Sequence, residues 1–284
     1  MNDLPKIPWY HVDHLIAEGG TAKVYWGIDL RSGFPVAIKE LKIRHFKNIV
    51  IKQKFIEETQ MYLYLTHPNI PKLVDFIDMK ETEQMFIVME FIEGRSLENY
   101  IYREIGLIPE QKALPMFLEI LDTVAYLHQK RILHLDIKAN NVMIQPNGKL
   151  KLIDLGIASR MSSASTSTTG EGYGTPAYMP PEQSEKRRVG VFSDIFSLGI
   201  MLFEMLTGTL PFTSDNPNPR QNIAEIKEKV KYAPTPQMSS FYPPITQNLQ
   251  FIVERALAKD PSERYQSCEE FANHIKGYMR KKRY

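Results

Sequence analysis

The sequence is poor in cysteine and has no long hydrophobic run. Among its 284 residues only Cys268 is a cysteine, which rules out an internal disulfide and fits a reducing compartment. No apolar stretch approaches the roughly 18 residues that a membrane span needs. Residues 1–5 also lack the basic and apolar pattern of a secretory signal. We therefore expect a cytoplasmic protein, or the cytoplasmic part of a longer one, with no membrane span in this chain.

An excess of charge of one sign is missing as well. Lysine and arginine total 35 and aspartate and glutamate total 33, which gives a net charge of +2. So small an imbalance does not favour nucleic acid or a membrane surface as the main partner, and we expect no nucleic-acid binding. Hydrophobic residues make up 43% of the chain, which is ordinary for a globular protein that is long enough to bury a full core.

The first third of the chain has the pattern of β-strands. Short segments rich in β-forming residues, separated by turn residues, predict five antiparallel strands at 12–16, 23–29, 35–41, 72–78 and 85–90. Residues 50–66 carry apolar side chains at helical spacing, among them Phe55 and Tyr62, and predict a helix between the third and fourth strands.

The remaining two thirds predict helices. Residues 109–130 read as one long helix that Pro115 should kink or restart, and residues 193–206 are apolar nearly all round, which is typical of a buried helix. Ser267 and Glu270 have the spacing of a capping box that opens a last helix. Residues 162–174 and 215–220 predict loops. We expect an α+β chain with a β-rich front lobe, a helical back lobe and a hinge near 91–94.

A segment that is either a phosphate-binding loop or an ordinary hairpin is followed by a lysine in the front lobe. Residues 17–24 lie between two predicted strands and include Gly19 and Gly20, whose backbone N–H groups can approach phosphate oxygens. Lys39 follows three apolar residues on the third strand and predicts a cation for the phosphates. A carboxylate must hold this lysine. We favour Glu58, which shares a helix face with Phe55, while its neighbour Glu57 remains the alternative.

The strongest catalytic signal is the segment 134–141, with the sequence HLDIKANN. Thirteen residues beyond it, Asp154 follows a strand-like segment, which is the spacing of a catalytic loop and a metal-binding aspartate. Asp136 would accept or orient the proton of a substrate hydroxyl, and Lys138 would neutralise charge on the moving phosphoryl group. Asn141 and Asp154 would bind Mg²⁺ through oxygen atoms. His134 is expected to be a buried structural residue.

With these motifs the chain resembles the eukaryotic-like (Hanks-type) serine/threonine protein kinases, bacterial members most of all, over residues 9–278. The resemblance implies a bilobal protein kinase fold, with a five-stranded antiparallel N-lobe, a helix C and a mainly helical C-lobe. It assigns residues 1–92 to ATP binding and residues 93–284 to catalysis and substrate docking. It also extends to the docking segment 174–182, to Asp194, and to Arg264, which is expected to pair with Glu182.

The resemblance implies ATP with Mg²⁺, or alternatively Mn²⁺, as the cofactor. The residues that it places against the nucleotide are Ile16, Ala17, Glu18, Gly19, Gly20, Thr21, Ala22, Val24, Ala37, Lys39, Met89, Glu90, Ile92 and Met143. Met89 would be the gatekeeper, and the backbone at residues 90–92 would hydrogen-bond adenine. Alanine replaces the family's preferred glycine at 17 and 22, and we expect this to weaken ATP binding modestly.

The resemblance further implies that the chain moves the γ-phosphate of Mg-ATP to serine or threonine hydroxyls of protein substrates, as part of a signalling process. Lys138 in the catalytic loop and Thr175 in the docking segment are typical of serine/threonine rather than tyrosine specificity. The alternative is a pseudokinase scaffold or nucleotide-binding module. The presence of Lys39, Asp136 and Asp154 argues against it.

Three departures from the family pattern concern regulation and activity. Leu135 stands where many relatives carry an arginine that binds a phosphate on the activation loop, and leucine cannot do this. Leu155 and Pro181 also depart from the pattern, and we expect both to preserve activity. The loop nevertheless offers the hydroxyls of Ser162, Ser163, Ser165, Thr166, Ser167, Thr168 and Thr169. Two interpretations stay open: a solvated linker, or a loop that is autophosphorylated while activity depends little on the modification.

Overall fold

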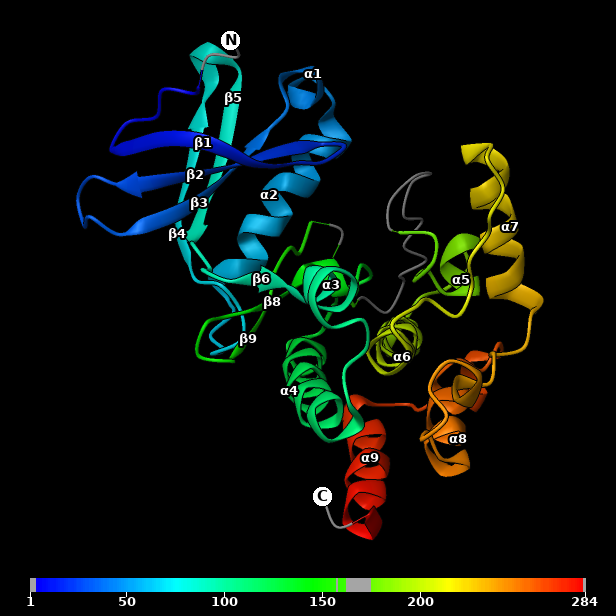
Figure 1. Cartoon of the computed structure of the whole chain (residues 1–284). Helices are drawn as coiled ribbons and strands as arrows, with labels where there is room; N and C mark the ends of the chain where they lie inside the picture. Colours follow the sequence, from blue (N-terminus) through cyan, green and yellow to red (C-terminus); the bar gives the residue numbers. More distant parts are fainter. Residues whose placement is uncertain (1–3, 157, 162–174, 283–284) are drawn as a thin grey trace. The chain divides into compact units, whose positions relative to one another are not determined.

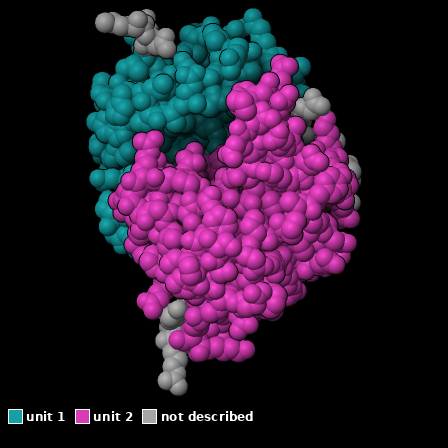
Figure 2. Space-filling model, turned by 45° about the vertical axis from the view of Figure 1, so that its right-hand side comes forward, with its two compact units in different colours: residues 1–94, 145–156 teal, residues 95–144, 157–284 magenta. Residues whose placement is uncertain are grey.

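The computed structural model describes residues 4–156, 158–161 and 175–282, and the chain divides into two compact units. The first unit comprises residues 1–94 together with 145–156, and the second comprises residues 95–144 together with 157–284. Figure 2 colours the residues of each unit. The whole loop predicted at 162–174, with all of its hydroxyls, lies outside the described residues. No helix in the described ranges is long and apolar enough to cross a membrane.

A five-stranded antiparallel sheet forms the body of the first unit (Figure 1). Its strand order is β1-β2-β3-β5-β4, and every neighbouring pair is antiparallel. The strands are β1 (Tyr10–Glu18), β2 (Ala22–Asp29), β3 (Pro35–Leu41), β4 (Leu73–Met79) and β5 (Gln84–Glu90), and the short β9 (Leu150–Leu152) also belongs to this unit. The five predicted strands are therefore confirmed, each end within two residues.

Both faces of this sheet carry buried apolar residues, because successive side chains on a strand point to opposite faces. On one face Tyr25, Ile38 and Val88 pack with residues that precede and begin β1. On the other face Leu41 and Ile87 pack with helix α2 (Ile49–Leu63), which follows the short α1 (Ile43–Phe46). The predicted helix is thus present, although it ends three residues earlier than expected.

The second unit is mainly helical. Its helices are α3 (Leu97–Asn99), α4 (Glu110–Gln129), α5 (Pro181–Ser184), α6 (Val191–Thr207), α7 (Pro219–Tyr232), α8 (Gln247–Ala256) and α9 (Cys268–Lys282). Two short antiparallel pairs join β6 (Arg95–Ser96) to β8 (Val142–Ile144) and β7 (Ile132–Leu133) to β10 (Ser159–Arg160). Helix α6 is buried throughout residues 193–207, as its all-round apolar pattern predicts, and packs against α4 and α8.

Proline and capping residues account for how three helices begin or continue. Helix α4 runs through Pro115, so the predicted restart there is wrong; Pro115 is exposed, and the carbonyl that it leaves unpaired can bond to water. Helix α7 already begins at Pro219, so the loop predicted at 215–220 is too long. Pro219 takes the first helical position, where an N–H is not needed, and Asn218 caps the helix. The hydroxyl oxygen of Ser267 accepts from the backbone N–H of Glu270 at 3.1 Å, as predicted.

Candidate active site

Lys39 lies at the centre of an ion cluster in the first unit. Its Nζ donates to both carboxylate oxygens of Glu58, at 2.7 and 2.8 Å, and to Oδ1 of Asp154 at 2.8 Å. Burial by itself would lower the pKa of Lys39, but the two carboxylates outweigh it and raise that pKa above its ordinary value. Lys39 is therefore a permanent cation. The structure also decides between the two candidate partners, because Glu57 is exposed and accepts a hydrogen bond from Gln53.

The backbone after β9 turns sharply to bring Asp154 to this lysine. Asp154 has a φ of 67°, in the left-handed region that non-glycine residues seldom occupy, and its Oδ1 also accepts from the backbone N–H of Gly156 at 3.1 Å. A Cβ on Gly156 would lie 3.0 Å from Oδ1 of Asp154 and 3.2 Å from Nζ of Lys39. Glycine at 156 therefore avoids a tight contact with both charged atoms of the ion cluster. The Asp154 side chain remains 43% exposed, so a cation from solution can reach it.

The loop predicted to cover phosphates is the turn between β1 and β2. The backbone N–H of Gly19 donates to the carbonyl of Ala22 at 2.9 Å, and Arg44 of α1 donates to the carbonyl of Gly20 at 2.8 Å. Lys42 forms an ion pair with Glu18 at 2.6 Å. Ala22 is buried in the core that includes Leu41 and Phe55, which gives its methyl group a packing role. The turn is thus anchored to the start of α1.

The residues predicted to surround adenine lie partly in each unit. Val24 and Ala37 lie on β2 and β3, Met89 and Glu90 end β5, and Met143 lies on β8 of the second unit. The Glu90 carboxylate pairs with Lys151 of β9, with Nζ–O distances of 2.9 and 3.0 Å. This pair, which sequence reasoning did not find, ties the end of β5 to the strand that leads to Asp154.

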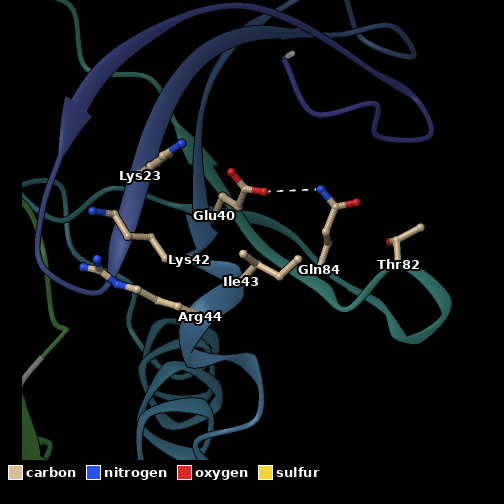
Figure 3. A pocket seen from close by; sticks show the side chains of 7 residues that line it. All are labelled: Lys23, Glu40, Lys42, Ile43, Arg44, Thr82 and Gln84. Carbon is tan, nitrogen blue, oxygen red and sulfur yellow. Dashed lines mark hydrogen bonds between the residues drawn. The ribbon is translucent and has the colours of Figure 1, made fainter. Parts of the chain in front are cut away.

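A separate groove of about 430 Å³ lies near the β1–β2 turn (Figure 3). It is lined by Lys23, Glu40, Lys42, Ile43, Arg44, Thr82 and Gln84. Glu40 directly follows Lys39 on β3 and so points to the opposite face of the sheet, where it accepts from Gln84 at 3.3 Å and from the Tyr25 hydroxyl at 2.9 Å. In Figure 3 the charged ends of Lys42 and Arg44 point away from Glu40. This groove is therefore distinct from the ion cluster around Lys39.

The second unit brings together the polar residues of segment 134–141. Lys138 Nζ donates to Oδ2 of Asp136 at 2.7 Å and to the Thr175 hydroxyl at 3.1 Å. The side-chain amide of Asn141 donates to the backbone carbonyl of Asp136 at 2.9 Å, which leaves its Oδ1 as the atom able to act as an oxygen ligand. A carboxylate, an ammonium and a hydroxyl thus meet at one point.

Asp194, at the start of α6, holds this segment in place. Its carboxylate accepts from the backbone N–H groups of His134 at 2.9 Å and Leu135 at 2.8 Å, and from the His128 ring at 2.7 Å. Burial raises the pKa of Asp194, but the hydrogen bond from His128 and the neighbouring charges outweigh burial. The pKa of Asp194 therefore lies below its usual value. Leu135 has a φ of 62°, a strained conformation that these bonds enforce immediately before Asp136. His134 is fully buried, as predicted.

The docking segment is fixed by a buried ion pair. Arg264, which is fully buried, donates from two guanidinium nitrogens to Glu182 at 2.8 and 3.0 Å, as expected from the sequence. Ser193 donates to the same carboxylate at 2.8 Å. Gln183 reaches back to the carbonyl of Leu135 at 3.1 Å. The end of the docking segment is thereby joined to both α6 and the catalytic segment.

A second carboxylate of α6, Glu204, was not predicted from the sequence. It accepts hydrogen bonds from the Tyr102 hydroxyl at 2.7 Å and from the hydroxyl of Tyr178 in the docking segment. The Tyr178 oxygen in turn accepts from the backbone N–H of Ala139 at 3.4 Å. Burial raises the pKa of Glu204 to about 7, although the two hydroxyls oppose this shift. Its sequence signal is a lone glutamate in an apolar helix, which says nothing about partners as distant as Tyr102.

Comparison with known proteins places these motifs in a family. The family model described as "Protein kinase domain" matches residues 10–275. The serine/threonine-protein kinase PrkC of Bacillus subtilis is 35% identical over 267 residues, which cover 94% of this chain and 40% of that protein. The probable serine/threonine-protein kinase PknB of Lactococcus lactis is 34% identical over 268 residues, 94% of this chain and 41% of that protein.

A third relative, the serine/threonine-protein kinase PksC of Streptomyces coelicolor, is 37% identical over 267 residues, 92% of this chain and 47% of that protein. The chain thus spans less than half the length of these relatives.

The geometry around Glu204 predicts a pH-dependent stability. A carboxyl whose pKa is about 7 in the folded chain and about 4.3 when unfolded stabilises the fold fully below pH 4, and this stabilisation is lost as the pH rises towards 7. Glu204→Gln mimics the protonated acid and should remove a pH dependence on the order of 2–3 kcal/mol. Urea unfolding of both proteins between pH 4.5 and 8 measures it. Parallel curves for the two proteins would contradict the assignment.

Proposed function

Since this chain belongs to the protein kinase family, we propose that it transfers the γ-phosphoryl group of ATP to serine or threonine hydroxyls of proteins. The observation that carries the proposal is that Lys138, in the second unit, contacts both Asp136 and Thr175 of the docking segment. A carboxylate beside an ammonium is what an incoming alcohol and a transferring phosphoryl group require together. We accordingly assign ATP binding to residues 1–92 and catalysis and docking to residues 93–284.

Each polar residue has a role in the proposed reaction. Asp136 orients the substrate hydroxyl and takes its proton while the new O–P bond forms and the bond to the bridging oxygen of ADP breaks. Lys138 stays beside the γ-phosphoryl oxygens and offsets their charge. Lys39, a permanent cation held by Glu58, binds the phosphates that remain on ADP. Glu58 acts through Lys39 and is a positioning residue.

The donor atoms fit a magnesium ion. Asp154 has an accessible carboxylate, and Asn141 keeps an amide oxygen for a ligand, so both offer the hard oxygen atoms that Mg²⁺, or Mn²⁺ in its place, prefers. The ion, when bound, would neutralise charge on the phosphates. Among the described residues no group of three or more acidic, histidine or cysteine side chains is arranged to hold a metal ion. We propose Asp154 and Asn141 as ligands of this ion, together with the phosphates of the nucleotide.

Buried Leu135 supports a specific form of regulation. Its side chain is 3% exposed and packs with Leu133 and Val189, so the position that could bind an activation-loop phosphate is apolar. We therefore retain the proposal that the hydroxyls of residues 162–169 are autophosphorylated while turnover depends little on it. The remaining partners would be protein substrates rather than nucleic acid. A cytoplasmic location fits the use of ATP and the free thiol of Cys268.

Asp136→Asn should abolish most of the activity. The amide cannot take a proton, so we expect turnover to fall by about 10²- to 10⁴-fold while folding is preserved. Transfer of labelled phosphate from Mg-ATP to a generic serine/threonine protein acceptor measures it. The matched control is Asn140→Asp, which alters an exposed residue in the same segment and should retain activity. Equal labelling by the native chain and the Asp136 variant would favour the scaffold alternative.

The two adjacent glutamates of α2 offer a second comparison. Glu58→Gln should lower turnover roughly 10- to 100-fold, because it releases the ammonium of Lys39 from its position. Glu57→Gln removes the same charge from an exposed position and should stay within about twofold of the native chain. Steady-state rates at several ATP concentrations distinguish the two. A larger loss with the Glu57 variant would reverse the assignment.

Replacement of all seven loop hydroxyls of residues 162–169 by alanine tests the regulatory proposal. We expect incorporation of phosphate into the kinase itself to drop, while turnover on an exogenous peptide changes by less than about tenfold. Mass spectrometry of the native chain after incubation with ATP locates the modified residues. A loss of about a hundredfold or more in peptide turnover would contradict the proposal.

A further inference from the structure

The strand register places Trp26 on the same face of the sheet as Lys39. Residues that face each other across neighbouring strands project to the same side. One row across the sheet consists of Ala17, Val24, Lys39 and Ile87, and the next consists of His14, Trp26, Ala37 and Met89. Trp26 is thus the direct neighbour of Ala37 and lies two residues from Val24 on its own strand.

This face is covered at one end and open at the other. Towards α2, Leu41 and Ile87 are fully buried in the core that includes Phe55. At the other end Val24, Trp26, Ala37 and Met89 all remain partly exposed. A row of apolar side chains that remain partly exposed, adjoining a buried cation, has the chemistry of a surface for a flat aromatic ring attached to phosphates.

Two further rings hold the indole of Trp26 in one orientation. The His14 ring stacks on it, with centroids 5.7 Å apart and planes inclined by 14°. The Phe91 ring meets it edge-on, with centroids 6.4 Å apart and planes at 88°. Phe91 directly follows β5, in the segment whose backbone is proposed to bind adenine. The indole is therefore preorganised, which lowers the entropic cost of using it as a binding surface.

We propose that Trp26, held by His14 and Phe91, contacts the adenine ring of bound ATP and forms the outer part of the apolar surface that covers it. This inference rests on the proposed function and adds a residue that the family motifs do not name. An aromatic ring stacks on any purine, so Trp26 contributes affinity and leaves the choice between ATP and GTP to the backbone of residues 90–92.

The chain has only two tryptophans, which allows a direct test. Trp9 is 65% exposed and precedes β1, so Trp9→Phe leaves Trp26 as the only tryptophan with little effect on the fold. Titration of this variant with Mg-ATP should change the tryptophan emission in a saturable way, with a midpoint equal to the Kd measured by calorimetry. This measurement keeps Trp26 in place and does not depend on turnover.

Replacement of Trp26 is the second test of the inference. Trp26→Leu should raise the Kd for ATP and for GTP by the same factor, about tenfold, and leave kcat at saturating ATP unchanged. Trp26→Phe keeps a ring and should recover most of the affinity. Trp9→Leu, the matched control, should bind ATP as the native chain does.

The outcomes separate the inference from the function on which it rests. If calorimetry detects ATP binding but the Trp26 emission stays constant, or if Trp26→Leu binds ATP as tightly as the native chain, the inference is overturned and the proposed function stands. If the native chain binds no ATP at all, both are overturned.

Discussion

The buried ammonium of Lys39 is the interaction on which the first unit depends. An unpaired charge in such a place would cost several kcal/mol, so the fold must bring carboxylates to it. Helix α2 supplies Glu58, and the turn after β9 supplies Asp154 by adopting a left-handed backbone and a glycine at 156. One ammonium between two carboxylates still leaves one negative charge uncompensated. This excess negative charge lies at Asp154, whose side chain is 43% exposed, and it favours a further cation there.

In the second unit the buried carboxylate of Asp194 has the comparable role of fixing the residues around it. A left-handed residue such as Leu135 costs on the order of 1–3 kcal/mol, and two backbone hydrogen bonds to Asp194 offset that cost. The carboxylate itself is kept ionised by His128. These bonds stabilise the strained backbone immediately before Asp136, whose side chain is partly exposed.

Most of the fold and the candidate site residues could be predicted from the sequence, because strand alternation and the spacing of residues 134–154 are local patterns. Contacts between residues that are distant in the sequence could not be predicted. The choice of Glu58 over Glu57 needed only the helical period, and it was predicted. The pairs Glu90–Lys151 and Tyr102–Glu204 join residues 61 and 102 positions apart, and nothing local marks them. The start of α7 was mispredicted because Pro219 was read as a loop residue. Proline disrupts the interior of a helix but is favoured at its first position. Trp26 was missed because its function depends on register with two other strands.

The distribution of unfavourable features argues against a scaffold that has kept only the fold. A chain selected for stability alone could replace the Lys39–Glu58 pair by apolar residues at no loss, and it would gain by relaxing the backbone at Leu135 and Asp154. Glu204 is a third such feature, because a buried carboxyl with a pKa of about 7 is destabilising in its ionised form. These features lie in the ion cluster, in segment 134–141 and beside the docking segment, although Trp9, Glu83, Arg131 and Lys186 also have a positive φ. Local conflict at residues with the chemistry for phosphoryl transfer is expected where a function limits stability.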